Sequence, residues 1–341
     1  MKLDVETYIK ALENEYYLDV YFSRQRSLKI MCFRAETFPG YIKYYIKYFV
    51  LIMLIPLSPF FSRVSFPGIL KGDVYFTCSD KSKKMFSKID SNNIFGIVDR
   101  GYKLDFNFSD FSDFLILSIA FIKRFKFSFW FYPEMMLIPE MIKVNRALVA
   151  ADINELYITN QYDRWAYFLT NLKLGCKVNL HQHGLVSHEY QPRNKISAVQ
   201  SLLCYDEDQL RIFKKHIVEN VTVVTIRAPF IFLHPDLGGS AVLLCCTSNN
   251  EYFHLENEIF NFLFDEERVV VAVKPHPNNN SRYSGFNNKF IGDSFPRVRV
   301  VIHFNSTLEV EYKNSDPNVL TINAAKTPIN DIVDSVLRVT K

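Results

Sequence analysis

The chain has 341 residues, of which 48% are hydrophobic, so it is long and apolar enough for two α/β domains and is not a disordered protein. The formal net charge of +4 is compatible with anionic substrates or an anionic membrane surface and is too small to indicate nucleic-acid binding. The 6 cysteines include no C-x-x-C pair and no signal-peptide pattern opens the chain, so we expect free thiols in a cytoplasmic protein.

The beginning of the chain is rich in aromatic residues and mixed in pattern. Apolar residues at helical spacing predict a helix over residues 5–17, and residues 27–33 are interpreted as a first strand. Strands are predicted over residues 72–78 and 94–98, with a short helix over residues 81–89 between them.

Residues 41–61 are the most apolar segment. Their uncharged part, residues 48–61, is shorter than the ~20 residues that a spanning helix needs, and two prolines interrupt it. Lys43 and Lys47 lie one helical turn apart beside tyrosines, as in a helix that rests on a membrane surface. A helix packed on the sheet is the alternative. Residues 111–131, where Phe is mixed with Lys and Arg, suit a membrane surface or an apolar helix with a basic patch, and a solvated helix end is the alternative.

From residue 135 onward helices and strands alternate regularly, which indicates βαβ units and a parallel sheet. The predicted helices cover residues 135–151, 164–174 and 207–216, and the predicted strands cover residues 156–159, 177–180, 201–205 and 221–226. A loop with prolines and a glycine pair at residues 227–239 then predicts a domain boundary. We therefore expect a first α/β domain of residues 1–228 and a second α/β domain of residues 229–341.

The second domain repeats the α/β pattern. Strands are predicted over residues 241–246, 269–273, 298–302 and 319–322, and helices over residues 251–264 and 329–339. The predicted fold class is therefore α/β, with two Rossmann-like domains and a crevice between them.

The sharpest motif, Lys274-Pro275-His276-Pro277, follows the buried strand at residues 269–273. The prolines end the strand and fix a turn, so a cation and an imidazole are held at the carboxyl end of a parallel strand, where open α/β sheets bind ligands. We expect Lys274 and His276 to face a phosphate, and a solvent-exposed lysine is the alternative.

The next predicted strand ends just before Asn305, Ser306 and Thr307. Ser306 or Thr307 is expected to cap a helix whose backbone N–H groups and positive dipole end suit a phosphate. Asn305 adds a neutral donor, and Glu311 or Glu309 is a candidate acceptor for ribose hydroxyls. The alternative for both glutamates is an acidic first helical turn. These strand ends together predict a pocket for a nucleotide monophosphate or diphosphate.

Two loops of the first domain also follow predicted strands. Gln182, His183 and Gly184 follow residues 177–180, and Gly184 allows a positive φ or a close approach of the backbone to a ligand. His183 is a candidate base, or a candidate hydrogen-bond donor to a phosphate. Its alternative role is to order the loop through hydrogen bonds to the backbone. No acidic or cysteine ligand completes a recognised zinc pattern, so no metal site is predicted.

Asp163 opens a predicted helix, and the simplest role for an aspartate there is an N-cap. It is also a candidate nucleophile or base toward a sugar, with Asp99 and Glu189 as rival carboxylates. The sequence contains no G-x-x-x-x-G-K-[ST] loop, no G-x-G-x-x-G fingerprint and no G-x-S-x-G elbow. A D-x-D metal–diphosphate motif is also missing, since the spacing at Asp206 and Asp208 falls at a helix start, so we expect phosphate binding without a metal.

Three motifs together resemble those of bacterial capsule and lipopolysaccharide glycosyltransferases of the GT-B fold, including transferases that use CMP-Kdo or CMP-sialic acid. They are Gln182-His183-Gly184, Lys274-Pro275-His276-Pro277 and Asn305-Ser306-Thr307-x-x-x-Glu311, within a matched region of about residues 156–311. The resemblance implies that His276, Ser306 and Thr307 contact the nucleotide phosphate, with Lys274 assisting. The residues that follow, from Tyr312 to Asn318, differ from the small and proline-rich ending of that pattern and leave the donor open.

The resemblance implies transfer of a sugar from a nucleotide-activated donor, with a CMP-linked acidic sugar favoured, to a growing bacterial surface glycan. Asp163 and His183 are the expected catalytic residues, and Gln182 and Gly184 are expected on the nucleotide side. No cofactor other than the donor is expected. The expected partners are the donor, a lipid-linked or glycan acceptor and the inner face of the plasma membrane. A CDP-glycerol-type polyol-phosphate transferase and a non-catalytic glycan-assembly subunit are the alternatives.

Overall fold

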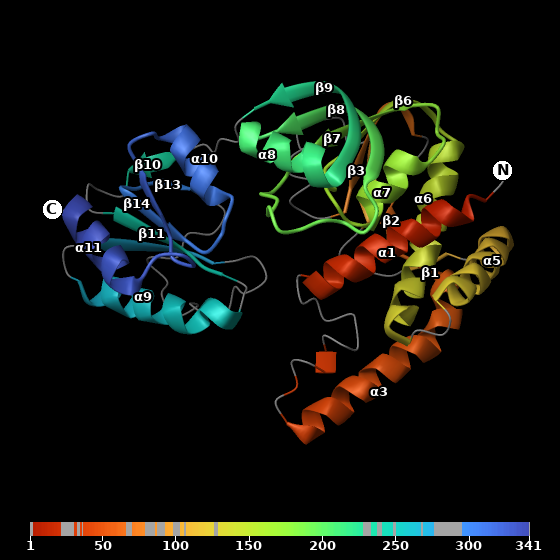
Figure 1. Ribbon diagram of the computed structural model, residues 1–341, viewed down its shortest axis with the longest axis horizontal. Coiled ribbons are helices and arrows are strands. Elements are labelled where there is room, and N and C mark those ends of the chain that lie inside the picture. The colour runs from red at the N-terminus through yellow and green to blue at the C-terminus, as the bar shows by residue number, and fades with distance from the viewer. Residues whose placement is uncertain are drawn as a thin grey trace. The chain divides into compact units, whose positions relative to one another are not determined.

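The computed structural model divides into two compact units, Met1–Ile226 and Arg227–Lys341 (Figure 1). The boundary expected from the sequence lies two residues further along, after residue 228. The residues described are 3–21, 31–32, 35, 37–65, 70–78, 86, 93–97, 103–105, 107–125, 129–227, 233–236, 241–247, 250–266, 269–275 and 295–340. Each unit contains its own parallel sheet, so the predicted α/β class is confirmed. The crevice between the units stays a prediction.

The first unit is built on a seven-stranded sheet with the order β2-β4-β3-β6-β7-β8-β9, in which only β2 runs antiparallel to its neighbour. After β3 the chain first adds β4 on one side and then β6 on the other. The carboxyl ends of β3 and β6 therefore flank a topological switch point, the place where open parallel sheets bind ligands. The strands are β2 (Val64–Ser65), β3 (Lys71–Thr77), β4 (Ile94–Ile97), β6 (Asp152–Ile158), β7 (Lys177–His181), β8 (Ile196–Cys204) and β9 (Val218–Ile226).

Helices pack on this sheet because their apolar residues recur on one face. Tyr8 of α1 and Phe168 of α7 are fully buried with ring centroids 4.8 Å apart, which joins the two helices over the sheet. A two-stranded ribbon pairs β1 (Phe61–Ser62) with β5 (Lys103–Leu104). The helical segments are α1 (Val5–Tyr21), α3 (Phe38–Leu54), η1 (Ile55–Phe60), α5 (Phe108–Phe125), η3 (Phe129–Leu137), α6 (Ile138–Val149), α7 (Arg164–Asn171), α8 (Glu207–Ile212) and η4 (Phe213–Ile217).

The second unit contains a four-stranded parallel sheet with the order β12-β11-β14-β15. All five residues of β11 are buried, because apolar side chains on both faces of this strand pack under helices. After β11 the chain first adds β12 on one side and then β14 on the other, which makes the carboxyl end of β11 the switch point of this sheet. The elements are β10 (His234–Asp236), β11 (Ala241–Cys245), η5 (Asn250–Tyr252), α9 (Phe253–Asp265), β12 (Val270–Lys274), β13 (Pro296–Arg297), β14 (Val300–His303), α10 (Leu308–Ser315), β15 (Leu320–Asn323) and α11 (Ile329–Val339).

Several boundaries differ from those expected. The helix predicted over residues 135–151 starts as the 3₁₀ segment η3, and α6 begins only at Ile138, with a proline in its first turn where the missing N–H is tolerated. Helix α7 ends at Asn171, earlier than the predicted residue 174. Strand β8 starts at Ile196 rather than at residue 201, because it pairs along β9.

Two predicted elements fall mostly on residues that the structure does not describe. The helix expected over residues 81–89 is one of them. The strand expected over residues 27–33 is the other, and its described members, Met31 and Cys32, are helical rather than extended.

Candidate functional site

In the first unit, polar side chains gather where β3 and β6 end. The Asn160 amide nitrogen donates to the sulfur of Cys78, directly after β3, at 3.0 Å and to a carboxylate oxygen of Asp163 at 2.6 Å. These bonds tie together the two loops that flank the switch point. Burial raises the pKa of Cys78 to about 12, so its thiol stays protonated and is not a nucleophile at neutral pH.

Asp163 is the N-cap of α7, as expected. Its backbone is extended and its second carboxylate oxygen accepts the Ala166 N–H at 3.0 Å. Burial of the carboxyl group, followed by the nearby Glu15 carboxylate, raises the pKa of Asp163. A carboxyl group with a raised pKa at a strand end suits proton transfer as well as capping.

His183 lies in the loop after β7 and is held by the loop after β6. Its Nδ1 is hydrogen-bonded to the carbonyl oxygen of Thr159, and its backbone N–H donates to Gln161 Oε1 at 3.2 Å. A carbonyl oxygen can only accept, so Nδ1 carries the proton and the lone pair of the neutral ring lies on Nε2. The expected loop-ordering role is therefore present, and the same bond fixes the tautomer that a base acting through Nε2 needs.

Two buried amides beside these groups were not singled out from the sequence. Asn160 and Gln161 are each 2% exposed, and Asn160 Oδ1 and Gln161 Nε2 have no hydrogen-bond partner within the part of the chain that the structure describes. An unpaired buried polar atom costs about 1–3 kcal/mol, so such atoms are rare away from binding sites. The one signal in the sequence is the place of both residues directly after a buried strand.

Gln182 does not have the expected position for a ligand contact. It has no exposed surface, and its amide nitrogen donates to Gly184 O at 2.9 Å and to Gln209 Oε1 at 2.7 Å. Its amide oxygen accepts the Tyr205 N–H at 2.9 Å. The prediction of a nucleotide contact is wrong for this residue, because its hydrogen bonds tie the loop after β7 to the start of α8. Gly184 is half-buried and does not adopt a positive φ.

In the second unit, Lys274 is the last residue of β12 and pairs with Cys245 of β11 at the carboxyl edge of the sheet. Its ammonium nitrogen lies 4.2 Å from the centroid of the Phe295 ring, a cation–π contact. The expected place of Lys274 at a parallel strand end is confirmed, whereas its contact with a phosphate stays a prediction. His276 lies outside the described residues, as does the rival carboxylate Asp99.

A fully buried histidine organises the end of β14. His303 Nδ1 accepts the Ser306 N–H at 3.3 Å, and His303 Nε2 lies 3.4 Å from a Glu309 carboxylate oxygen. Burial lowers the pKa of His303, so its neutral ring carries the proton on Nε2, facing Glu309. Sequence reasoning did not select His303 as a site residue, because it reads as the end of a buried strand.

Asn305 is held in a left-handed conformation, with φ 51°, which is uncommon outside glycine. A pair of hydrogen bonds stabilises it: Asn323 Nδ2 donates to Asn305 Oδ1 at 2.9 Å, and the Asn305 N–H donates to Asn323 Oδ1 at 3.3 Å. The Asn305 side chain is therefore used to fix the turn that presents the two hydroxyl residues after it.

Ser306 caps α10 through a hydrogen bond from the Leu308 N–H at 3.3 Å, whereas the Thr307 hydroxyl makes no capping bond. The Glu309 N–H donates to the Ser306 carbonyl and the Val310 N–H to the Thr307 carbonyl. The expectation that the start of this helix offers free N–H groups to a phosphate is therefore wrong, because the first N–H groups are already bonded. Contacts of the Thr307 and Lys274 side chains with a phosphate stay predictions.

Acidic groups are also present at this helix start. Glu309 and Glu311 both lie in the first turn of α10, and Glu309 pairs with Lys313 at 2.9 Å. Glu309 is thus used in helix contacts, and the role of Glu311 as an acceptor for ribose hydroxyls stays a prediction. Among the described residues, no group of three or more His, Cys, Asp or Glu side chains is placed to hold a metal ion.

No family model matches this chain, and no curated protein matches it. Two solved structures have a distant structural similarity. TarM aligns at 10% identity and a TM-score of 0.34 over 55% of this chain and 47% of TarM, so the chain spans about half of its length. The wall teichoic acid polymerase TagF aligns at 10% identity and a TM-score of 0.33 over 90% of this chain and 76% of TagF.

Proposed function

We propose that this chain is a transferase of the GT-B type that uses a nucleotide-activated donor. One observation carries the proposal: Lys274 and the segment from Asn305 to Thr307 lie at the carboxyl ends of β12 and β14, and both of these strands pair with β11. With strands ~4.8 Å apart, the two groups flank the β11 end about 10 Å from each other. This is the switch point of the sheet, where a nucleotide binds in open α/β folds.

The second unit would hold the nucleotide and the first unit would present the acceptor. In the transfer step an acceptor hydroxyl attacks the anomeric carbon of the donor sugar, and the bond between that carbon and the phosphate oxygen breaks. The nucleotide leaves with the electron pair, so negative charge grows on its phosphate, where Lys274, His276 and Thr307 would stabilise it. The proton of the acceptor hydroxyl would pass to His183 Nε2 or to Asp163.

The favoured donor is a CMP-linked acidic sugar of the Kdo or sialic acid type, and the favoured acceptor is a lipid-linked or glycan chain at the inner face of the plasma membrane. These finer points follow from the motif resemblance of Lys274-Pro275-His276-Pro277 and of Ser306-Thr307. Phosphate recognition by a lysine, an imidazole and hydroxyls needs no metal, which supports transfer without one.

The test is CMP release from three donors by the full-length protein, with water as the acceptor. CMP-Kdo, CMP-sialic acid and CDP-glycerol are each incubated with the wild type and with Lys274→Met, whose uncharged side chain of similar length removes the cation. We expect CMP release from a CMP-sugar and a loss on the order of a hundred-fold in the variant, as for other stabilisers of developing charge. Release from CDP-glycerol alone would make the chain a polyol-phosphate transferase, and release from none would contradict a catalytic role.

A further inference from the structure

Helix α3 presents an apolar face that the rest of the first unit does not cover. Of its seventeen residues only Tyr48 is buried. The uncovered side chains recur every three or four residues and are between 45% and 77% exposed, namely Phe38, Ile42, Ile46, Phe49, Val50 and Met53. A soluble protein rarely exposes so continuous an apolar surface unless it binds something there.

The opposite face of the same helix rests on protein. Tyr48, at 2% exposure, packs in a small cluster with Met31, Cys32, Tyr44 and Ile52. In Figure 1, α3 runs along the outside of the first unit as its outermost helix. A helix covered on one side by its own domain and uncovered on the other is typical of a segment that lies in the plane of a membrane interface.

By length and composition alone, residues Phe38–Phe60 could also cross a membrane, and 11% of an apolar 18-residue window within them is buried. Three observations favour the interfacial placement. Helix α3 ends at Leu54, so its length is about 26 Å against a hydrocarbon thickness of about 30 Å. The 3₁₀ segment η1 then carries Pro59, and Phe61 leads directly into the β1–β5 ribbon of the folded unit.

The charges near this face fit an anionic lipid surface. Lys43 and Lys47 are exposed and lie one turn apart on α3, beside the apolar row, so their long side chains can reach lipid headgroups. No acidic residue occurs anywhere between Phe38 and Phe61. An anionic bilayer attracts lysines and repels acidic residues, so it accounts for a face that carries lysines and no acidic residue. A protein partner of mixed charge does not account for it.

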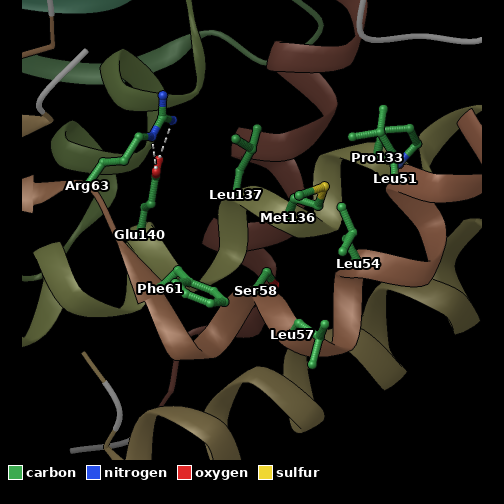
Figure 2. A pocket seen from close by; sticks show the side chains of 10 residues that line it. All are labelled: Leu51, Leu54, Leu57, Ser58, Phe61, Arg63, Pro133, Met136, Leu137 and Glu140. Atoms are coloured by element: carbon green, nitrogen blue, oxygen red, sulfur yellow. Dashed lines mark hydrogen bonds and ion pairs between the residues drawn. The ribbon is translucent and has the colours of Figure 1, made fainter. Parts of the chain in front are cut away.

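A cavity of about 560 Å³ opens beside the end of this helix. Its walls are mainly aliphatic, with Leu54 and Leu57 on one side and Met136 and Leu137 of η3 on another (Figure 2). Leu54 and Leu57 are also 41% and 51% exposed, so the cavity adjoins the uncovered face. Its volume lies within the range of small-molecule sites.

The two charged side chains of the cavity, Arg63 and Glu140, pair with each other. Arg63 Nε lies 2.6 Å from Glu140 Oε1, and the Arg63 terminal nitrogen donates to the other Glu140 oxygen at 3.1 Å. Figure 2 shows this pair on one side of the cavity and the aliphatic side chains away from it. The remaining wall offers dispersion contacts to an apolar chain and has few groups that would orient a polar ligand.

We propose that the apolar face of α3 rests on an anionic bilayer and that the adjoining cavity takes one hydrocarbon chain of a membrane lipid. The lipid site does not depend on whether the chain is a transferase, because no residue of the nucleotide site takes part in it. A stretched lipid chain leaving the bilayer beside α3 would meet Leu57 first and Met136 deeper in the cavity.

The first test is flotation of the full-length protein with vesicles of phosphatidylcholine, alone or mixed with phosphatidylglycerol. The variant Phe49→Glu should lower the partition coefficient between vesicles and water on the order of ten-fold or more. The reason is that it removes an aromatic ring that would be buried in the lipid when the protein binds. Lys43→Gln and Lys47→Gln should each lower it about five-fold on the mixed vesicles only. Val223→Glu is the control, since Val223 is also an exposed apolar residue, at 47% against 56% for Phe49, and lies on β9 at the far edge of the sheet from β2.

The second test separates the cavity from the surface. The fatty-acid probe 11-(dansylamino)undecanoic acid, which gains fluorescence in apolar sites, is titrated in the absence of vesicles. Wild type and Phe49→Glu should bind it at one site per chain, whereas Met136→Trp, which fills the cavity, should lose it. A circular dichroism melt of each variant confirms that it is folded before its binding is compared.

Four results would overturn the proposal. The first is equal flotation of Phe49→Glu and wild type, and the second is unchanged probe binding in a folded Met136→Trp. The third is loss of probe binding in Phe49→Glu, which would show that the probe binds the surface of α3 rather than the cavity. The fourth is resistance of the membrane-bound protein in cells to alkaline carbonate, which would make residues Phe38–Phe60 a spanning segment. None of these readouts involves a nucleotide, so failure of the transferase proposal leaves them intact.

Discussion

Replacement of Arg164 by methionine is expected to lower the free energy of unfolding by about 3–5 kcal/mol. Arg164 is 7% exposed, and one of its terminal nitrogens lies 3.0 Å from a carboxylate oxygen of Glu15, which is 2% exposed. Its other terminal nitrogen is 3.8 Å from Glu140. Since charges buried in protein depend on their partners, removal of the guanidinium takes away the cation that lies 3.0 Å from the Glu15 carboxylate.

A double variant tests this reason directly. Glu15→Leu combined with Arg164→Met removes both charges and should be more stable than Arg164→Met alone. Arg211→Met is the matched control, because Arg211 pairs with Asp208 at 2.9 Å on an exposed helix surface, where ion pairs contribute little. The measurement is urea unfolding of the four proteins. Equal midpoints for Arg164→Met and Arg211→Met would show that the buried pair does not stabilise the fold.

Replacement of Asp163 by asparagine is expected to lower the rate of CMP release about 10²–10⁴-fold while the protein stays folded. Asparagine caps helices as well as aspartate does, so the bond from the Ala166 N–H is kept. The pKa of Asp163 is raised, which means that the folded protein disfavours its charged form. Above the unfolded pKa the buried carboxylate therefore lowers stability, so its removal stabilises the fold, whereas loss of the oxygen that accepts the Asn160 amide opposes this gain.

The two roles of Asp163 predict opposite results. If Asp163 only caps α7, the asparagine variant should retain the wild-type rate. Asp206→Asn is the control, because Asp206 caps α8 in the same way, with the Gln209 N–H at 2.7 Å. If Asp163 is the base, the wild-type rate should also fall on acidification through a pKa above that of an ordinary aspartate, and the Asn variant should lack that step.

The architecture of the sheets was largely predictable from local sequence. The apolar runs that form β11, β12 and β14 are bounded by prolines and polar residues. Because apolar residues follow one another without alternation, these runs indicate strands buried on both faces. The break after Leu54 was also predictable, because Pro56 and Pro59 cannot continue an α-helix. The π-helical segment η4 at the end of α8 was not, since no residue in it prevents the ordinary helix that was expected.

Contacts within the site were predictable only where they are local. The cap at Asp163 joins residues three positions apart, so the sequence alone indicates it. The bond from Asn160 to Cys78 spans 82 positions and depends on the order of strands in the sheet, which local patterns do not contain. Gln182 was misassigned because a motif does not distinguish an amide facing a ligand from one buried in the loop that carries it.

The most direct test of the nucleotide site is the thermal stability of the full-length protein with CMP, CDP, UDP, GDP and UMP, each with and without EDTA. At a hundred times its dissociation constant, CMP should add about 2.7 kcal/mol of apparent stability, unchanged by EDTA. His276→Ala should abolish the shift, whereas His254→Ala should not, because the His254 side chain is 94% exposed on α9 of the same unit. A larger shift with UDP or GDP would mean that the donor is a UDP-linked or GDP-linked sugar rather than a CMP-linked one. No shift with any nucleotide would contradict the transferase proposal.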